Sequence, residues 1–201
     1  MKLSPVVLEG PTLRLEPLSE GVLPALTEAA LSNREIWKHI PFVVETPAHV
    51  AGLVDLAGAM AAEGKAVSFA TRLRDGGQVV GSTTIFLVAP AVPSVEIGAT
   101  WIVPRWQRTQ VNTEAKLLML AHCFEALGCA RVELKTDARN LRSRAAIRRI
   151  GASEEGTLRS HMRRADGSLR DSVLFSIVAA EWPAVRARLD AMLERNKTKA
   201  S

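Results

Sequence analysis

Apolar and polar residues alternate along several short stretches of the chain, and between these stretches apolar residues recur three and four positions apart. The first pattern is typical of strands with one buried face, and the second of amphipathic helices. Seven stretches have the alternation or the β-branched content of strands. They cover residues 12–16, 67–73, 78–88, 95–103, 132–136, 156–163 and 169–178.

Helical spacing and capping residues predict five helices. Ser19, Thr46 and Asn140 have side chains that accept hydrogen bonds from the free amides at a helix start, so each predicts an N-cap. Gly128 and Gly151 follow two of the helices and predict their ends. The helices are expected near residues 19–30, 46–64, 113–127, 140–151 and 181–201.

Turn residues indicate how the strands are connected. Asp75, Gly76 and Gly77 supply the positive φ of a tight hairpin, and a proline-containing turn at residues 90–93 returns the chain to the next strand. Residues 67–103 are therefore expected to form a three-stranded antiparallel meander. The strand, helix and strand within residues 95–136 are expected to form a β-α-β crossover. A turn at residues 165–167 is expected to join the last two strands.

These elements predict an α+β fold with a mixed, mostly antiparallel twisted sheet of about seven strands and helices on both faces. At 201 residues the chain suits one hydrophobic core with a helical extension rather than two domains. We expect a single domain over residues 1–201, with a core at about 12–182 and a C-terminal helix and basic tail at 181–201.

The net charge of +5 is concentrated in one part of the sequence. Between residues 139 and 170, nine arginines face three acidic residues, Glu154, Glu155 and Asp166. A basic stretch of this kind predicts a polyanionic partner, and both an acidic or RNA-rich surface and a small phosphorylated ligand satisfy it. A solvated helix face is the alternative. The arginines are Arg139, Arg142, Arg144, Arg148, Arg149, Arg159, Arg163, Arg164 and Arg170.

Several classes of protein are excluded by what the sequence lacks. No apolar run reaches the roughly 18 residues of a membrane span and the start is not signal-like, so a cytoplasmic protein that contacts no membrane is expected. Cys123 and Cys129 have neither disulfide-framework nor CxxC spacing and are expected to be buried thiols. The four histidines are scattered, and nucleophile-elbow, Walker and GxGxxG motifs are missing, so neither a metal site nor the chemistry of those motifs is expected.

Two segments carry a family resemblance. Residues 105–113 form a charged turn between a strand and a helix, and residues 140–152 begin with Asn-x-x-Ser and end with Gly151 and Ala152. Together with the order of elements, they make residues 12–182 similar to the GCN5-related N-acetyltransferases (the GNAT family). Within that family the chain resembles the branch of ribosomal-protein N-terminal acetyltransferases. The resemblance implies an enzyme that transfers an acetyl group from acetyl-CoA (coenzyme A) to a primary amine.

The charged turn departs from the family pattern at two positions. Gln110 and Asn112 stand where the family has glycines, which permit close approach of the backbone to a phosphate. The turn is therefore expected to lie slightly further from the diphosphate of coenzyme A or to use its amides differently. The amides of residues 111–113, at a helix start, and the side chains of Arg105 and Arg108 are expected to hold this anion. A capped helix with solvated arginines is the alternative.

Coenzyme A is expected to contact residues from three places in the sequence. In the family the pantetheine arm pairs with a strand, which here holds Trp101, Ile102 and Val103, and Asn140 contacts the arm or orders the site. The expected cofactor-binding residues are Trp101, Ile102, Val103, Arg108, Thr109, Gln110, Val111, Asn112, Thr113, Asn140 and Arg144.

Two residues are expected to be catalytic. The acceptor amine must lose a proton before or during attack, and Glu96, a carboxylate in an apolar strand where the family often places a base, is the predicted proton acceptor. The sequence has no tyrosine to assist the departing thiolate, so the hydroxyl of Ser143 is expected to donate a hydrogen bond to the sulfur. As alternatives, Glu96 pairs with a neighbouring arginine on a wet sheet face, and Asn140 and Ser143 only cap and pack.

The acceptor site is the least defined in the sequence. The family builds this side from its first helices and its last hairpin, so Trp37, His39, Phe42 and Trp106 are expected to line it, unless they belong to the core. Direct attack in a ternary complex by the N-terminal amine of a protein or peptide is expected, with a small amine (antibiotic, polyamine or aminoacyl compound) as the alternative. A non-catalytic acyl-CoA-binding module and an RNA-binding module are further alternatives, and a homodimer is left open.

Overall fold

The computed structural model describes residues 1–89, 92–164 and 166–200, and its centre is a twisted sheet. Within these residues the sheet has eight strands in the order β1-β2-β3-β4-β5-β6-β8-β7, and only β5 and β6 run parallel. The bounds are β1 (Leu8–Glu9), β2 (Leu13–Pro17), β3 (Ala66–Leu73), β4 (Val79–Ala89), β5 (Ser94–Ile102), β6 (Arg131–Asp137), β7 (Ser153–Arg163) and β8 (Leu169–Val178).

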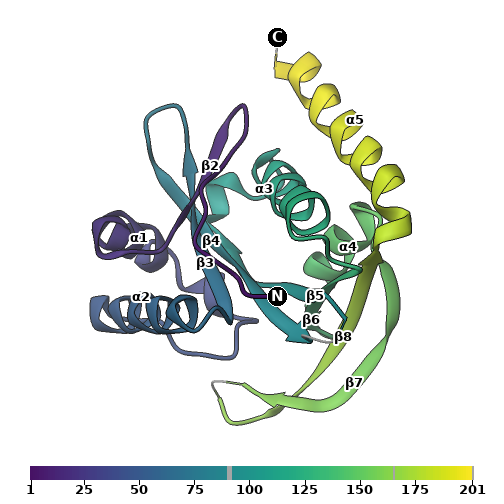
Figure 1. The fold of residues 1–201 in the computed structure, drawn as a ribbon. Coiled ribbons are helices and arrows are strands. Elements are labelled where there is room, and N and C mark those ends of the chain that lie inside the picture. Colours follow the sequence, from purple (N-terminus) through teal and green to yellow (C-terminus); the bar gives the residue numbers. More distant parts are fainter. Residues whose placement is uncertain (90–91, 165, 201) are drawn as a thin grey trace.

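Helices cover both faces of this sheet (Figure 1). Helices α1 and α2 pack on one face, and α3, α4 and α5 lie on the other, so each face has its own buried apolar cluster. The α-helices are α1 (Leu23–Leu31), α2 (Pro47–Ala62), α3 (Val111–Ala121), α4 (Leu141–Arg149) and α5 (Trp182–Ala200). Short helical turns are η1 (Glu20–Val22), η2 (Arg34–Trp37), η3 (Pro104–Trp106), η4 (His122–Ala126) and η5 (Ala179–Glu181).

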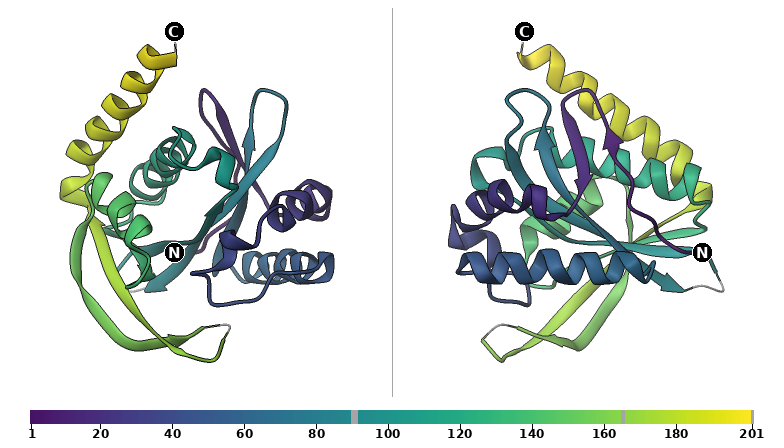
Figure 2. Two further views of the ribbon diagram at one scale, coloured as in Figure 1. Left: turned by 180° about the vertical axis from the view of Figure 1, so that it is seen from behind. Right: turned by 60° about the vertical axis from the view of Figure 1, so that its left-hand side comes forward.

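The predicted fold class is confirmed. The seven predicted strands correspond to β2–β8, and β1 adds a two-residue strand that is too short to show alternation in the sequence. The meander β3-β4-β5 and the crossover β5-α3-β6 form as expected. Residues 90–91 and 165, which belong to two of the predicted turns, lie outside the described residues. The last two strands form a long hairpin that extends beyond the rest of the sheet (Figure 2).

The predicted helix ends are mostly right, because capping is a local property of the sequence. The Thr46 hydroxyl accepts from the amide of His49 at 3.3 Å, and the Asn140 side chain accepts from the amide of Ser143 at 3.0 Å. The prediction for Ser19 is wrong, because its side chain makes no capping hydrogen bond and a 3₁₀ turn precedes α1.

One predicted helix ends in a different kind of turn, and the predicted C-terminal helix forms over nearly its whole expected range. The helix expected over 113–127 is α3 followed by the π-helical turn η4, which is closed by a hydrogen bond from the amide of Leu127 to the carbonyl of His122. The basic tail expected after residue 181 is helical as far as Ala200, as part of α5. In the described part of the chain, no helix is both long and apolar enough to cross a membrane.

The feature that positions the functional site is the short pairing between β5 and β6. These strands pair over only three residue pairs, which end at Glu96 and Glu133, although β5 continues to Ile102 and β6 to Asp137. Ala99 has a positive φ of 47°, and the register between β4 and β5 shifts beside it. This bulge bends β5 away from β6. The sheet is therefore open in its middle.

Candidate active site

A cavity of about 920 Å³ lies where β5 and β6 separate, and it reaches both faces of the sheet. From one face it is lined by the turn before α3, by α3 and by α4. From the other face it is lined by the segment after η2 and by β8. Glu96 and Ser143 both line it, so the structure brings the two expected catalytic residues into one cavity.

The start of α3 forms one end of the cavity and is free to bind an anion. Gln110 is the N-cap residue but gives no side-chain cap, and its amide nitrogen Nε2 contacts the Thr12 hydroxyl at 3.4 Å instead. The Thr109 hydroxyl accepts from the amide of Val111 at 3.3 Å. Asn112 and Thr113 lie in the first turn of α3, where backbone N–H groups have no carbonyl partner four residues back within the helix. Helix amides with nearby arginines suit a diphosphate.

The missing glycines are not needed where they were expected. Gln110 has a φ of −70°, which any residue adopts, whereas the positive φ of the turn falls on Arg108, at 63°. The left-handed residue of the turn is therefore Arg108, two positions before Gln110. Arg108 also carries a positive charge. This arrangement fits the group that the family resemblance implies, because the helix amides remain uncovered.

A buried glutamate in the first turn of α3 fixes the position of this helix start. The Glu114 carboxylate, which is 2% exposed, accepts hydrogen bonds from the amides of Thr12 at 2.9 Å and Leu13 at 3.0 Å. Gly10 lies against it so closely that a Cβ there would collide with the carboxylate. The anion site is thereby tied to the start of β2.

The expected cofactor-binding residues fall into two groups. Six line the cavity, namely Trp101, Ile102, Arg108, Thr109, Asn112 and Asn140. The remaining five are not among the residues that line the cavity, namely Val103, Gln110, Val111, Thr113 and Arg144. The hydroxyl of Thr113, a fully buried residue, accepts from Arg149 at 3.0 Å. Arg144 is held by Glu154 at 3.6 Å and by the carbonyl of Ala138 at 3.2 Å, so its guanidinium is directed elsewhere.

Glu96 is paired with a lysine from the facing strand. Its Oε2 lies 2.8 Å from Nζ of Lys135, which also lies 3.5 Å from Glu133. Burial alone lowers the pKa of Lys135, but the hydrogen bond and charge of Glu96, with those of Glu133, outweigh it and raise the pKa. An ion pair with an arginine was the alternative in the sequence, and the actual partner is this lysine of β6.

Asn140 and Ser143 meet at the start of α4. The capping hydrogen bond between them fixes the first turn of the helix, and both residues line the cavity. Among the described residues, the Ser143 hydroxyl makes no hydrogen bond. It is free to donate into the cavity, where the helix start also favours negative charge.

The expected acceptor-side residues do not form one wall. His39 and Phe42 line the main cavity and also an adjoining cavity of about 570 Å³, and burial lowers the pKa of His39. Trp37 lines only the smaller cavity, and its indole packs 5.2 Å from the ring of Trp101. Trp106 lines neither cavity and packs against the main core under the guanidinium of Arg105.

Sequence reasoning missed Lys116, which lines the cavity from α3. The residue is 5% exposed, and its Nζ lies 2.9 Å from the Thr100 hydroxyl and 3.4 Å from the Thr83 hydroxyl. Burial lowers its pKa to about 7. The signal was available, because Lys116 falls at helical spacing with the buried residues Thr113 and Leu120.

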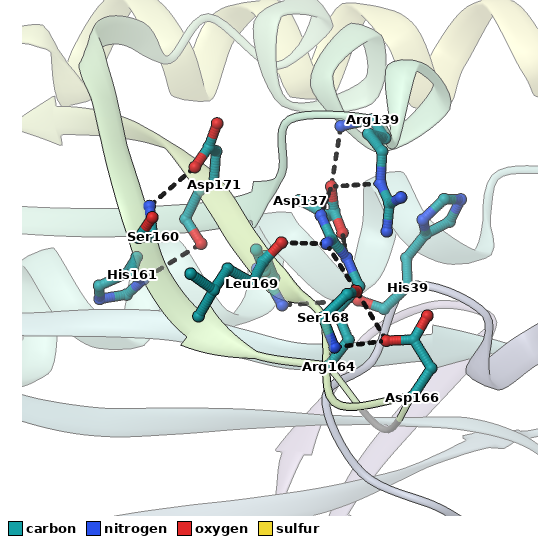
Figure 3. A network of polar contacts seen from close by, with 12 residues as sticks. His39, Asp137, Arg139, Ser160, His161, Arg164, Asp166, Ser168, Leu169 and Asp171 are labelled. Atoms are coloured by element: carbon teal, nitrogen blue, oxygen red, sulfur yellow. Dashed lines mark hydrogen bonds and ion pairs between the residues drawn. The ribbon is translucent and has the colours of Figure 1, made fainter.

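Four of the nine arginines between residues 139 and 170 form ion pairs among the described residues, namely Arg139, Arg144, Arg148 and Arg164. Arg148 pairs with Glu154, and Arg164 with Asp137 at 2.8 Å (Figure 3). Arg142 donates to Gln107. The expectation of an acidic or RNA-rich partner therefore stays a prediction, and these pairs reduce the charge that is available for one.

The chain combines a helix start suited to an anion with a cavity at a split β-α-β crossover, and this cavity holds a carboxylate and a hydroxyl, an arrangement that suits an acyltransferase with an acyl-CoA donor. A family model described as acetyltransferase (GNAT) domain matches residues 12–153, and the chain belongs to this family. The chain is therefore an acetyl-CoA-dependent N-acetyltransferase, as the sequence predicts.

Solved structures agree over nearly the whole chain. A protein from T. thermophilus, assigned as an acetyltransferase, is 34% identical over 96% of this chain and 100% of its own, with a TM-score of 0.82. A GCN5-related N-acetyltransferase from Brucella melitensis is 29% identical over 95% and 86%, with a TM-score of 0.86. RimJ from Mycobacterium smegmatis, in complex with CoA-disulfide, is 27% identical over 94% and 95%, with a TM-score of 0.80. A comparison with curated proteins finds no match.

Proposed function

We propose that this enzyme acetylates the N-terminal amine of a protein or peptide, which attacks the acetyl donor directly in a ternary complex. The observation that carries the proposal is the continuity of the cavity across the sheet, because it gives donor and acceptor separate faces on which to bind. The adjoining cavity shares His39, Phe42 and Arg170 with it, so the acceptor side continues well beyond the amine. An extended acceptor such as a peptide suits this space.

Acetyl-CoA supplies an acetyl group activated as a thioester. Arg108, Thr109 and Asn112, with the first amides of α3, would hold its diphosphate at one end of the cavity. Trp101 and Ile102, on the part of β5 that pairs with β4 but not with β6, would bind the pantetheine arm. Strand amides that have lost their β6 partner suit this role, because they need an acceptor.

Glu96 takes the proton of the acceptor ammonium, directly or through one water molecule. Lys135 orients the carboxylate through one oxygen, Oε2, and leaves Oε1 for the acceptor. A Cβ on Gly98 would come within 3.0 Å of Oε1, so the glycine keeps space open beside the base.

Ser143 donates a hydrogen bond from its hydroxyl to the departing sulfur, on which negative charge develops. A thiol with a pKa of about 8.5 needs only modest stabilisation as a thiolate, and one hydroxyl donor next to a helix start is suited to this task. Asn140 acts indirectly, because its cap fixes the backbone that carries Ser143.

The proposal is tested by measuring thiol release from acetyl-CoA with a panel of unblocked peptides and, in parallel, with polyamines, aminoglycosides and amino acid amides. We expect peptides to be acetylated on the α-amine, with the site located by mass spectrometry. The same peptides with blocked N-termini are the matched control and should give no release. Turnover of small amines alone would overturn the peptide assignment and favour the small-amine alternative.

A further inference from the structure

Arg170, on β8, is a buried cation without a counter-charge. The residue is 7% exposed, and its one hydrogen bond is from Nη1 to the carbonyl of His39 at 3.5 Å. Its Nε is buried and has no hydrogen-bond partner within the described residues. Buried charges in proteins are normally paired, because an unpaired one loses its hydration without compensation. This guanidinium therefore lacks an anion.

The nearby carboxylates are already engaged by other groups (Figure 3). Asp137 accepts from Nε of Arg164 at 2.8 Å, from its Nη2 at 3.2 Å and from the amide of Arg139 at 2.9 Å. Burial alone would raise the pKa of Asp137, but these hydrogen bonds and charges outweigh it and lower the pKa. Its negative charge is thus balanced without Arg170.

Two further carboxylates on this side of the molecule are also engaged. Asp166, which lines the smaller cavity with Arg170, accepts from the amide of Ser168 at 2.9 Å, and Glu96 is paired with Lys135 at 2.8 Å. Burial lowers the pKa of Arg170, and the charges of Asp137 and Glu96 only partly oppose this shift. Among the described residues, none forms an ion pair with the Arg170 guanidinium.

Arg170 lies at the junction of the two cavities, since it lines both of them. The smaller cavity is also basic, because five cationic residues line it against Glu45 and Asp166. Glu96 lines the main cavity together with Arg170, and its charge acts on the guanidinium. The five cations are Arg34, Lys38, Arg139, Arg164 and Arg170.

We propose that Arg170 binds a carboxylate of the acceptor, so that the preferred substrates are amines with a carboxylate close to the reacting nitrogen. For a peptide this means Asp or Glu next to the N-terminal residue, and for a small amine it means an amino acid with a free carboxylate. The planar guanidinium can hold a carboxylate through two parallel hydrogen bonds, with its unpaired Nε as one donor. The inference rests on the proposed N-acetyltransferase function and names the acceptor's chemistry.

The test compares acceptors that differ only in charge. One pair is a peptide that begins Ser-Glu and its Ser-Gln isostere, and the other is γ-aminobutyrate and its amide. We expect kcat/KM for the acid of the productive pair to exceed that for the amide by at least about tenfold, as for a hydrogen bond to a charged group. Equal rates for acid and amide would overturn the proposal. Selectivity within the small pair alone would refute the peptide assignment and leave the carboxylate inference standing.

Variants connect this preference to Arg170. In Arg170→Gln we expect the acid-to-amide ratio to fall to about one, because the carboxylate contact is what distinguishes the two acceptors. Arg170→Lys should retain part of the preference, since the charge remains but the planar fork does not. Arg159→Gln, a change at an exposed arginine of β7, should leave the ratio unaltered. A preference that survives in Arg170→Gln would refute the assignment.

A binding measurement covers the case in which a variant folds poorly or no pair is turned over. With coenzyme A present, the Ser-Glu peptide should raise the melting temperature of the wild-type protein more than Ser-Gln does, because it supplies the missing anion. Circular dichroism of Arg170→Gln and Arg170→Lys shows whether each is folded. An equal rise with both peptides would contradict the proposal.

Discussion

Glu96 and Lys135 face each other across the opening between β5 and β6, with Oε2 and Nζ 2.8 Å apart. The two strands cease to pair after Glu96 and Glu133, and this ion pair links the last paired residue of β5 to a residue of β6 beyond the pairing. It holds the predicted base at the narrow end of the opening.

Replacing the predicted base should affect catalysis and leave donor binding intact. We expect Glu96→Gln to lower kcat by about 10²- to 10⁴-fold, as for loss of a general base, with an unchanged dissociation constant for coenzyme A. Steady-state kinetics and calorimetry measure the two quantities. The control is Glu133→Gln, because this second carboxylate contacts Lys135 but does not line the cavity. A similar loss of kcat in both variants would assign the effect to Lys135 rather than to Glu96.

Substitutions of Asn140 and Ser143 should have different effects, because we expect Asn140 to stabilise the fold and Ser143 to take part in catalysis. Asn140→Ala removes the acceptor for the Ser143 amide, so we expect the free energy of unfolding to fall by about 1 kcal/mol. Ser143→Ala keeps that cap and removes only the hydroxyl, so stability should be nearly unchanged while kcat falls. Urea unfolding and acetyl-transfer assays provide the two measurements. If Ser143→Ala retained full kcat, its role as a donor to the sulfur would be wrong.

Lys116 should make stability depend on pH in a predictable direction. Its pKa of about 7 lies below that of the unfolded chain, so between about pH 7 and 10.5 the unfolded state binds more protons and stability rises with pH. The stability that is lost by burying Lys116 is largest at and below pH 7, and this loss disappears above about pH 10.5. Lys116→Met removes it, so the variant should be more stable at pH 7 by roughly 3 kcal/mol.

The advantage of Lys116→Met over the wild type should shrink by about 2 kcal/mol between pH 7 and pH 9, since one displaced pKa changes stability by up to about 1.4 kcal/mol per unit. Urea unfolding at both values measures it. Lys65→Met is the matched control, because the Lys65 side chain is 66% exposed, and its effect should not vary in this range. A constant difference for Lys116→Met would show that this lysine is charged in the folded protein.

The positive φ of Arg108 can be tested with a pair of variants. Arg108→Gly and Arg108→Ala both remove the guanidinium, but only alanine retains the cost of a left-handed backbone, so the glycine variant should be more stable by about 1 kcal/mol. Both should bind coenzyme A several-fold more weakly than the wild type, and to the same extent. Unchanged affinity in both would remove Arg108 from the diphosphate site.

The parts of the fold that depend on local sequence could be predicted. Thr46 and Asn140 cap helices through hydrogen bonds three residues ahead, and the meander follows from turns of a few residues. The Ser19 cap was wrong because a 3₁₀ turn replaced the helix start, which is a small difference in backbone energy. The two-residue β1 depends on pairing with β2 rather than on any pattern of its own.

The sequence could indicate which candidate site residues lie near one another, but not which groups they contact. Glu96 and Ser143 lie in one cavity because β5 and α4 are placed by the fold, which the sequence indicated. The partner of Glu96 comes from β6, 39 residues away, and such a contact depends on the register of a crossover. Trp106 was placed at the acceptor entrance, but its large apolar surface is packed against the core. In the sequence Arg170 is one of nine arginines between residues 139 and 170, and its special position could not be predicted because it depends on burial in the folded protein.

The early separation of β5 and β6 also bears on the order of kinetic events. In the proposed ternary complex the donor and the acceptor bind from opposite faces of the sheet, so we expect spent coenzyme A and the acetylated product to leave by different faces. On this expectation neither must wait for the other to dissociate. Product inhibition patterns should therefore correspond to random rather than compulsory release of the two products. This kinetic behaviour would follow from the short pairing of β5 and β6, which extends over only three residue pairs.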